Sequence, residues 1–185
     1  MEKYLSEIEA ALNQGLKFIA LQSALTLPDI CGALISNGKE SVKDRYVNWY
    51  NNHFQSKYHL MLSAEDCYYF RCSNVHQGSF QHKKSSYSKI VFIDCNSILN
   101  DNTIQTILPD GTVETIYTLD INIFCRFMLS AVRNWLEEVK DNELFKKNYA
   151  KMVKVHEEDL PGFKFMGPSF LVYLYKSKTF VLLFY

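Results

Sequence analysis

The chain has 185 residues, of which 48% are hydrophobic and 15% aromatic, so it has enough apolar material for the core of one domain. Its twenty basic and twenty acidic residues cancel, which argues against a protein that coats nucleic acid through bulk positive charge. A local basic patch remains compatible with this balance, and "QHKKSSYSK" (81–89) is the most basic polar stretch. Five widely spaced cysteines without a CxxC pair predict neither a zinc ribbon nor a disulfide framework.

Neither end of the chain predicts targeting to a membrane. The N-terminal "MEKYLSEIEAAL" is acidic and alternates polar with apolar residues, unlike a signal peptide. Lys176 and Lys178 interrupt the most apolar stretch, "FLVYLYKSKTFVLLFY", and leave runs too short to span a bilayer. We therefore expect a soluble cytoplasmic protein.

The first third of the chain predicts three helices. Residues 2–25 have apolar side chains at helical spacing and no proline, which predicts one amphipathic helix. Pro28 marks a break, after which "DICGALIS" predicts a short second helix that ends near Gly38. Ser41, three residues before Asp44, has the spacing of an acidic capping box and predicts the start of a third helix.

The same capping spacing, Ser63 with Asp66, predicts a fourth helix, "AEDCYYFRCSNVHQ", which Gly78 closes. The pattern then becomes β-rich over 89–118: a strand "KIVFID", followed by a hairpin whose turn is at "PDG".

Asp120 is the expected cap of a long helix over 121–139, and "NELFKKNYAKMVKV" predicts another. The buried side of the helix over 121–139 is expected to comprise Ile123, Phe127, Leu129, Val132, Leu136 and Val139. The aromatic tail (161–185) is ambiguous between strands and a packed helix, and its composition favours β-structure. We expect a mainly α protein: a single domain over 1–185, a helical bundle with an inserted β-hairpin and an appended tail.

The fourth predicted helix carries an arginine and a histidine five positions apart, in "FRCSNVHQGS". At about 100° per residue, Arg71 and His76 lie roughly 140° apart around the axis, and Glu65 falls within about 20° of the histidine. His76 is in the last turn, where the helix dipole and unpaired carbonyls favour a protonated imidazole. Such an imidazole could move the proton of a ribose 2′-hydroxyl while the guanidinium neutralises charge on the phosphate.

Non-catalytic interpretations stay open at this point. A histidine in a last helical turn commonly binds carbonyl groups, and a helical arginine commonly pairs with an acid. Cys72 and His76, at i and i+4, could share a metal with Cys67 or Glu65, but no second ligating element is visible and we expect no metal and no cofactor.

A second aromatic and basic stretch, "DRYVNWYNNHF", brings Arg45 and Trp49 together and could stack an RNA base. Aromatic residues at helical spacing belong more often to the core or to a dimer interface. Arg126 and Arg133 could line the same groove, or Arg133 could pair with Glu137.

Arg71-x4-His76 on a helix of a helical bundle, preceded by the acidic "AED" turn, resembles the HEPN superfamily (higher eukaryotes and prokaryotes nucleotide-binding). The likeness covers roughly 1–80 and 120–155. It implies a metal-independent endoribonuclease, a toxin or defence effector that acts as a homodimer with the two motifs facing across the two-fold axis, and a cognate antitoxin or other protein partner.

By this resemblance Arg71 would stabilise the phosphate and His76 would act as acid and base. Glu65 or Asp66 would orient either group, and Tyr68, Cys72, Asn74, Arg45 and Trp49 are the candidate RNA-binding residues. Active members usually have a polar residue, often Asn, where this chain has Cys72, so two alternatives stay open. One is a non-catalytic HEPN module that binds RNA, nucleotide or protein, and the other is an unrelated helical interaction protein.

Overall fold

The computed structural model describes residues 1–79, 81–95, 102–153, 163–165 and 172–174. The chain divides into two compact units, Met1–Ala150 and Lys151–Tyr185. In the second unit, β4 (Phe163–Phe165) pairs antiparallel with β5 (Val172–Leu174). The β-structure expected for the tail is present there, and the rest of 161–185 lies outside the described residues.

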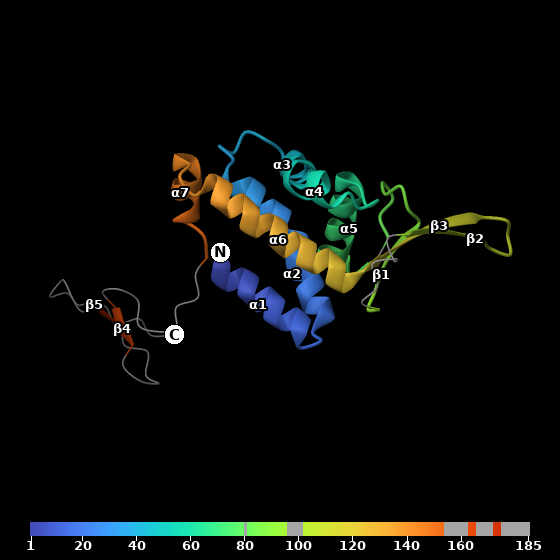
Figure 1. Ribbon diagram of the computed structural model, residues 1–185, viewed down its shortest axis with the longest axis horizontal. Helices are drawn as coiled ribbons and strands as arrows, with labels where there is room; N and C mark the ends of the chain where they lie inside the picture. The colour runs from blue at the N-terminus through green and yellow to red at the C-terminus, as the bar shows by residue number, and fades with distance from the viewer. Residues whose placement is uncertain (80, 96–101, 154–162, 166–171, 175–185) are drawn as a thin grey trace. The chain divides into compact units, whose positions relative to one another are not determined.

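The first unit is mainly α-helical and begins with two helices where the sequence predicts one (Figure 1). α1 spans Glu2–Asn13 and α2 spans Lys17–Leu34. The prediction of a continuous helix over 2–25 is wrong, because the chain turns at Gly15, whose φ of 80° lies in the left-handed region.

The break expected at Pro28 is also wrong, because α2 continues through it. Pro28 is buried, and the apolar residues before and after it, Leu27 and Cys31, are completely buried. Packing on both sides of the proline therefore outweighs the lost backbone hydrogen bond, and the predicted short second helix is the end of α2.

The capping predictions for the next helices are confirmed. Ser41 caps α3 (Val42–Trp49) and Ser63 caps α5 (Ala64–Gln77); each serine Oγ accepts from the backbone N–H of the aspartate three residues on, at 3.1 Å. Between them, α3 continues into a π-helical segment, η1 (Tyr50–Gln55), and a short α4 (Ser56–Tyr58). Gly78, at φ 62°, ends α5.

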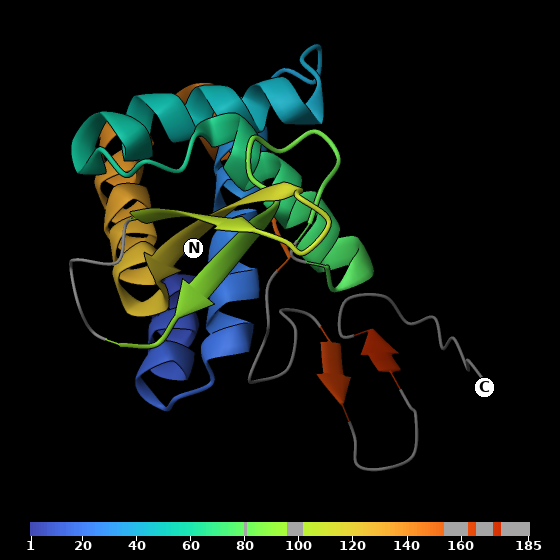
Figure 2. The same cartoon turned by 90° about the vertical axis from the view of Figure 1, so that its right-hand side faces the viewer.

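A three-stranded mixed sheet follows, in the order β1-β3-β2 (Figure 2). β2 (Asn102–Ile107) and β3 (Val113–Asp120) form the expected antiparallel hairpin. β1 (Lys89–Ile93) pairs with the other edge of β3 in parallel, with Lys89 opposite Ile116 and Ile93 opposite Asp120. The hairpin is thus one part of a sheet that also contains the strand predicted before it.

α6 (Ile121–Val139) leads directly from β3 and packs with α1 and α2, and α7 (Glu143–Tyr149) follows it. Of the six residues expected on the buried side of α6, only Leu129 and Val132 are buried. The buried stripe is rotated from the expected one and includes Phe124, Cys125, Met128, Ala131 and Trp135. Within the described part of the chain, no helix has the length and apolarity needed to cross a bilayer.

Asp120 ties the sheet to α6 and is completely buried. Its carboxylate accepts from the N–H groups of Asn122 at 2.8 Å and Ile123 at 3.0 Å, and from both the N–H and the Sγ of Cys95 at 3.1 Å. Burial acts to raise the pKa of Asp120, but these hydrogen bonds outweigh it and lower the pKa to about 2.

Asp120→Asn is expected to be less stable than the parent by about 2 kcal/mol at pH 7. Because the pKa falls on folding from 3.8 to about 2, the stabilisation is present above pH 4 and is lost as the pH falls through about 2. Urea denaturation of both proteins at pH 7 and at pH 2.5 measures the effect. A stability difference that is the same at both pH values would contradict it.

Candidate functional site

The two motif residues lie on the C-terminal half of α5. His76 is exposed in the last turn of the helix, one turn after the half-buried Cys72. The Arg71 side chain is only 17% exposed. The imidazole is thus open to solvent, and the guanidinium faces the interior of the unit.

Arg71 forms an ion pair with Asp29, a residue in the middle of α2. Arg71 Nη2 lies 2.5 Å from Asp29 Oδ2, and the Asp29 side chain is 14% exposed. Asp29 Oδ1 and Arg71 Nε are both buried, and neither has a hydrogen-bond partner among the described residues. Buried charged groups with unused hydrogen-bonding capacity are rare in folded proteins and are typical of functional sites.

Two arginines and one histidine act electrostatically on the Asp29 carboxylate. Burial raises the pKa of Asp29, while the charges of Arg71, Arg45 and His76 each act to lower it. The structure therefore pairs Arg71 with an acid that was not among the predicted site residues, and His76 and Arg45, one of the predicted RNA-binding residues, act electrostatically on the same acid. The signal was present in the sequence, because Asp29 is the only charged residue between Lys17 and Lys39.

Arg45 reaches this site because α2 and α3 approach closely at Gly32. A Cβ atom at Gly32 would lie 2.9 Å from the carbonyl oxygen of Arg45 and 3.0 Å from its Cβ atom. Glycine is therefore required for this helix spacing. Arg45 Nη1 donates to the carbonyl of Glu40 at 2.9 Å, and its Nε is buried without a hydrogen-bond partner in the described part of the chain.

Tyr68 and Cys72 also belong to the site. Arg71 Nη1 lies 3.9 Å from Cys72 Sγ, a weak interaction. Burial raises the pKa of Tyr68, and a hydrogen bond to Cys72 acts in the same direction. The Tyr68 ring packs edge-on against the buried Tyr46, with 5.4 Å between centroids. The Arg71 guanidinium therefore has the carboxylate of Asp29 on one side and this thiol on the other.

The remaining predicted site residues lie elsewhere. Trp49 is only 2% exposed and packs edge-on against Trp135 in the core, so no base can stack on it in this conformation. Asn74 is buried and accepts from Gln22 Nε2 at 3.2 Å. Glu65 is exposed. The pKa of Lys43 is raised mainly by its hydrogen bond to Tyr69, and the charge of Glu65 acts in the same direction.

Asp66, a predicted orienting residue, instead anchors the loop that follows α5. Its side chain accepts from Ser63 Oγ at 2.7 Å through one oxygen. Through the other it accepts from Ser85 Oγ at 2.9 Å and from the Ser86 N–H at 2.6 Å. Asp66 thus has its hydrogen-bonding capacity used by the helix cap and the loop, and the acid next to Arg71 is Asp29.

The other groupings considered from the sequence do not form. Cys67 is buried with its Sγ 3.2 Å from Tyr46 Oη, and no three His, Cys, Asp or Glu residues in the described ranges are arranged to hold a metal ion together. Arg133 pairs with Glu2 at 3.1 Å and Glu9 at 2.7 Å, not with Glu137. Arg126 donates to Asn13 at 3.2 Å.

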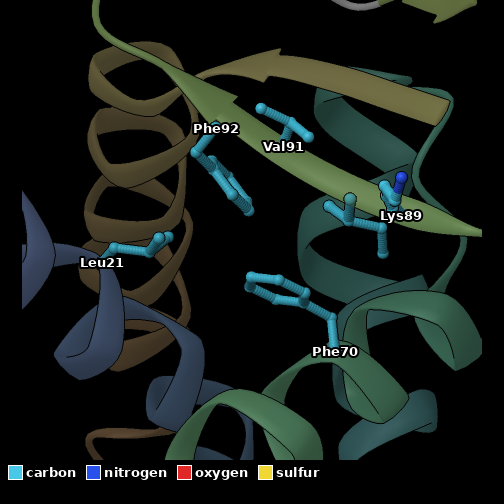
Figure 3. A pocket seen from close by; sticks show the side chains of 6 residues that line it. Leu21, Phe70, Lys89, Val91 and Phe92 are labelled. Carbon is cyan, nitrogen blue, oxygen red and sulfur yellow. The ribbon is translucent and has the colours of Figure 1, made fainter. Parts of the chain in front are cut away.

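A pocket of about 400 Å³ lies under β1 (Figure 3), and neither Arg71 nor His76 lines it. Its lining is almost entirely apolar and comprises Leu21, Phe70, Lys89, Ile90, Val91 and Phe92. Its one charged residue, Lys89, is paired with Glu114 at 2.6 Å. Phe70 lies about 120° around α5 from His76, so this cavity and the motif are on different faces of the helix.

We expect Arg71→Met to lower the free energy of unfolding by about 3 kcal/mol at pH 7, because it leaves the Asp29 carboxylate buried without its partner. The Asp29→Asn/Arg71→Met double variant is expected to regain most of this stability. Urea denaturation of the parent, both single variants and the double variant measures the coupling.

The pH dependence of the free energy of unfolding tests whether the unpaired Asp29 carboxylate destabilises Arg71→Met. Burial without Arg71 raises the folded-state pKa of Asp29 further above its unfolded value, so Arg71→Met should be closest to the parent in stability at acidic pH and fall behind as the pH rises. Additive single effects, with no recovery in the double variant, would contradict the ion pair.

Comparison of the chain with protein-family models, with curated proteins and with solved structures gave no match.

Proposed function

We propose that this chain is a metal-independent endoribonuclease of HEPN type, in which His76 moves the proton and Arg71 stabilises the phosphate. The observation that supports the proposal most is the largely buried ion pair of Arg71 with Asp29, an acid on which Arg45 and His76 also act electrostatically. An exposed imidazole and an under-satisfied guanidinium on the same half of one helix are the group types that general acid–base chemistry at a phosphodiester needs. The R-x4-H spacing on α5 adds to it.

In the proposed reaction, His76 removes the proton from a ribose 2′-hydroxyl, and the resulting oxygen attacks the adjacent phosphorus. The bond from phosphorus to the 5′ oxygen breaks, and that oxygen receives a proton from an imidazolium. The products are a 2′,3′-cyclic phosphate and a 5′-hydroxyl end. Arg71 neutralises the charge that builds up on the phosphate oxygens.

Asp29 has the role of a positioning residue in this scheme. It holds Arg71 through Nη2, which leaves Nη1, now 3.9 Å from Cys72 Sγ, for a phosphate oxygen. A charge-assisted hydrogen bond from Nη1 to phosphate is stronger than its contact with a thiol. The phosphate can therefore replace the thiol without breaking the ion pair.

The proposal includes a homodimer, in which one histidine accepts the proton and a second one donates it. Val75, between the motif residues, is 39% exposed and offers an apolar contact beside the site. A nuclease of this kind acts on cytoplasmic RNA as a toxin or defence effector, under the control of an antitoxin or another protein partner. Light scattering after size-exclusion chromatography tests the dimer.

A non-catalytic HEPN module that binds RNA, nucleotide or a protein is the second candidate. The Arg71–Asp29 ion pair favours it, because the guanidinium already has a carboxylate partner at 2.5 Å. Such a module would retain RNA without turnover.

Cleavage of single-stranded RNA by the purified chain in EDTA tests the proposal. We expect products with 2′,3′-cyclic phosphate and 5′-hydroxyl ends, and no cleavage of DNA or of 2′-O-methyl RNA of the same sequence, since both lack the attacking hydroxyl. Binding without cleavage would favour the second candidate. Cleavage of DNA, or cleavage that requires added divalent ions, would reject the mechanism.

A further inference from the structure

The loop after α5 brings an aromatic pair to the same face of the helix as His76. The rings of Tyr69 and His82 are stacked, with centroids 4.7 Å apart and planes 8° from parallel. Tyr69 and His76 lie within about 20° around the α5 axis and about 10 Å apart along it. Adjacent nucleotides of one RNA strand can bridge this separation.

One lysine contacts the stacked pair, and two exposed lysines follow His82 in the chain. Lys43 Nζ, from α3, lies 4.9 Å from the centroid of the Tyr69 ring and donates to Tyr69 Oη at 2.9 Å. Lys83 and Lys84 are exposed directly after His82. Glu65 and Asp44 are the acids that act on Lys43. Lys43 on the Tyr69 ring and the two lysines after His82 provide charge for a phosphate near a surface for a base.

The stack is not needed to hold the loop, because Asp66 anchors it through Ser85 and Ser86. The orientation of the His82 ring is fixed separately by the Lys84 N–H, which donates to His82 Nδ1 at 3.2 Å. With Nδ1 as the acceptor, the proton of the neutral ring is on Nε2, which is then a donor. Tyr69 and His82 are both half-buried, so the stacked pair is partly open to solvent, and Nε2 of His82 is a directed donor beside it.

We propose that Tyr69 and His82, with Lys43, Lys83 and Lys84, bind an unpaired base and its phosphate next to the nucleotide that reacts at His76. The choice of RNA as ligand rests on the proposed nuclease function; the stacking site itself does not. Because a base must leave its duplex to stack on protein rings, the site selects single-stranded RNA.

Fluorescence anisotropy with a 2′-O-methyl single-stranded RNA, which resists cleavage, tests the site in the full chain. Tyr69→Leu is expected to raise Kd by a factor of about 10 to 100, since base stacking on an aromatic ring has this effect when the ring is removed. Tyr69→Phe keeps the ring and loses only the hydroxyl that accepts from Lys43 Nζ, so it should weaken binding far less than Tyr69→Leu does. His82→Ala should weaken binding, whereas His59→Asn, at an exposed left-handed position elsewhere, should not.

A second measurement separates charge from stacking. The Lys83→Gln/Lys84→Gln variant should reduce the slope of log Kd against log salt by about 1 to 2, and Tyr69→Leu should leave the slope unchanged. A duplex of the same sequence should bind more weakly than the single strand and should respond little to Tyr69→Leu.

The outcomes of these binding and cleavage experiments separate a failure of the stacking site from a failure of the nuclease proposal. An unchanged Kd in folded Tyr69→Leu and His82→Ala would overturn the stacking site even if the parent cleaves RNA. Weakened binding in these variants of a protein that never cleaves RNA would support the site and overturn the nuclease. A parent that fails to bind single-stranded RNA would overturn both.

Discussion

Replacing His76 with alanine is expected to lower the rate of RNA cleavage by a factor of about 10² to 10⁴, the usual contribution of a general acid–base group. The Kd for uncleavable RNA should change little, because the imidazole acts on the 2′-hydroxyl proton rather than holding the strand. His76 is exposed, so the substitution should leave the fold intact. Single-turnover cleavage in EDTA, with circular dichroism for folding, measures both effects.

Arg71 requires a more careful set of variants, because removing it also disturbs Asp29. Arg71→Lys keeps the charge next to Asp29 but has no second nitrogen that could donate to a phosphate oxygen while the first one pairs with Asp29. We expect it to fold and to cleave RNA at a rate well below that of the parent. His59→Asn is the matched histidine control and should retain full activity. Unchanged cleavage in His76→Ala or in Arg71→Lys would reject the role assigned to that residue.

Among substitutions in the hydrophobic core, we expect the largest loss of stability at Phe124. This residue of α6 is completely buried, and its ring lies 5.2 Å from that of Phe92 on β1 and 5.7 Å from that of Phe54 in the π-helical segment, between centroids. Phe124→Ala removes contacts with both the sheet and the helices and leaves a cavity. It should lower the free energy of unfolding by about 3 to 5 kcal/mol.

Phe18→Ala provides the matched control, because Phe18 is a phenylalanine in α2 with 60% of its surface exposed. Its effect should stay within about 0.5 kcal/mol of the parent. Urea denaturation followed by fluorescence yields both values. Equal destabilisation in the two variants would mean that the burial of Phe124 does not determine its contribution.

Features that depend on neighbouring residues could be predicted from the sequence. The serine caps of α3 and α5, the Gly78 end of α5 and the β2–β3 hairpin all follow from residues within a few positions of one another. Asp120 at the start of α6 belongs to this group. The boundaries of α6 agreed with those expected, although its buried stripe did not.

The errors concern features that depend on tertiary packing. Pro28 ends a helix by local rules, but buried neighbours keep α2 continuous. The parallel pairing of β1 with β3 joins residues far apart in the chain, which no local pattern can show. Trp49 had the spacing of either a core or a binding residue, and only its packing on Trp135 distinguishes them.

Only part of the candidate site could be predicted from the sequence, because the rest of it depends on tertiary packing. Arg71, His76, Tyr68 and Cys72 lie on one helix, so periodicity could place them together. Asp29 comes from α2, and its proximity to Arg71 depends on how two helices pack. A lone charge within an apolar helix is the sequence signal that could have identified it.

The close packing at Gly32 has an evolutionary consequence. Any larger residue there would force the backbone of α3 away from α2 and carry Arg45 with it. The charge balance around the ion pair would change while both residues of the R-x4-H pattern remained in place. If the proposed activity holds, a descendant of this chain can lose it through a scaffold position, and an intact motif in such a descendant would be a poor guide to whether it is active.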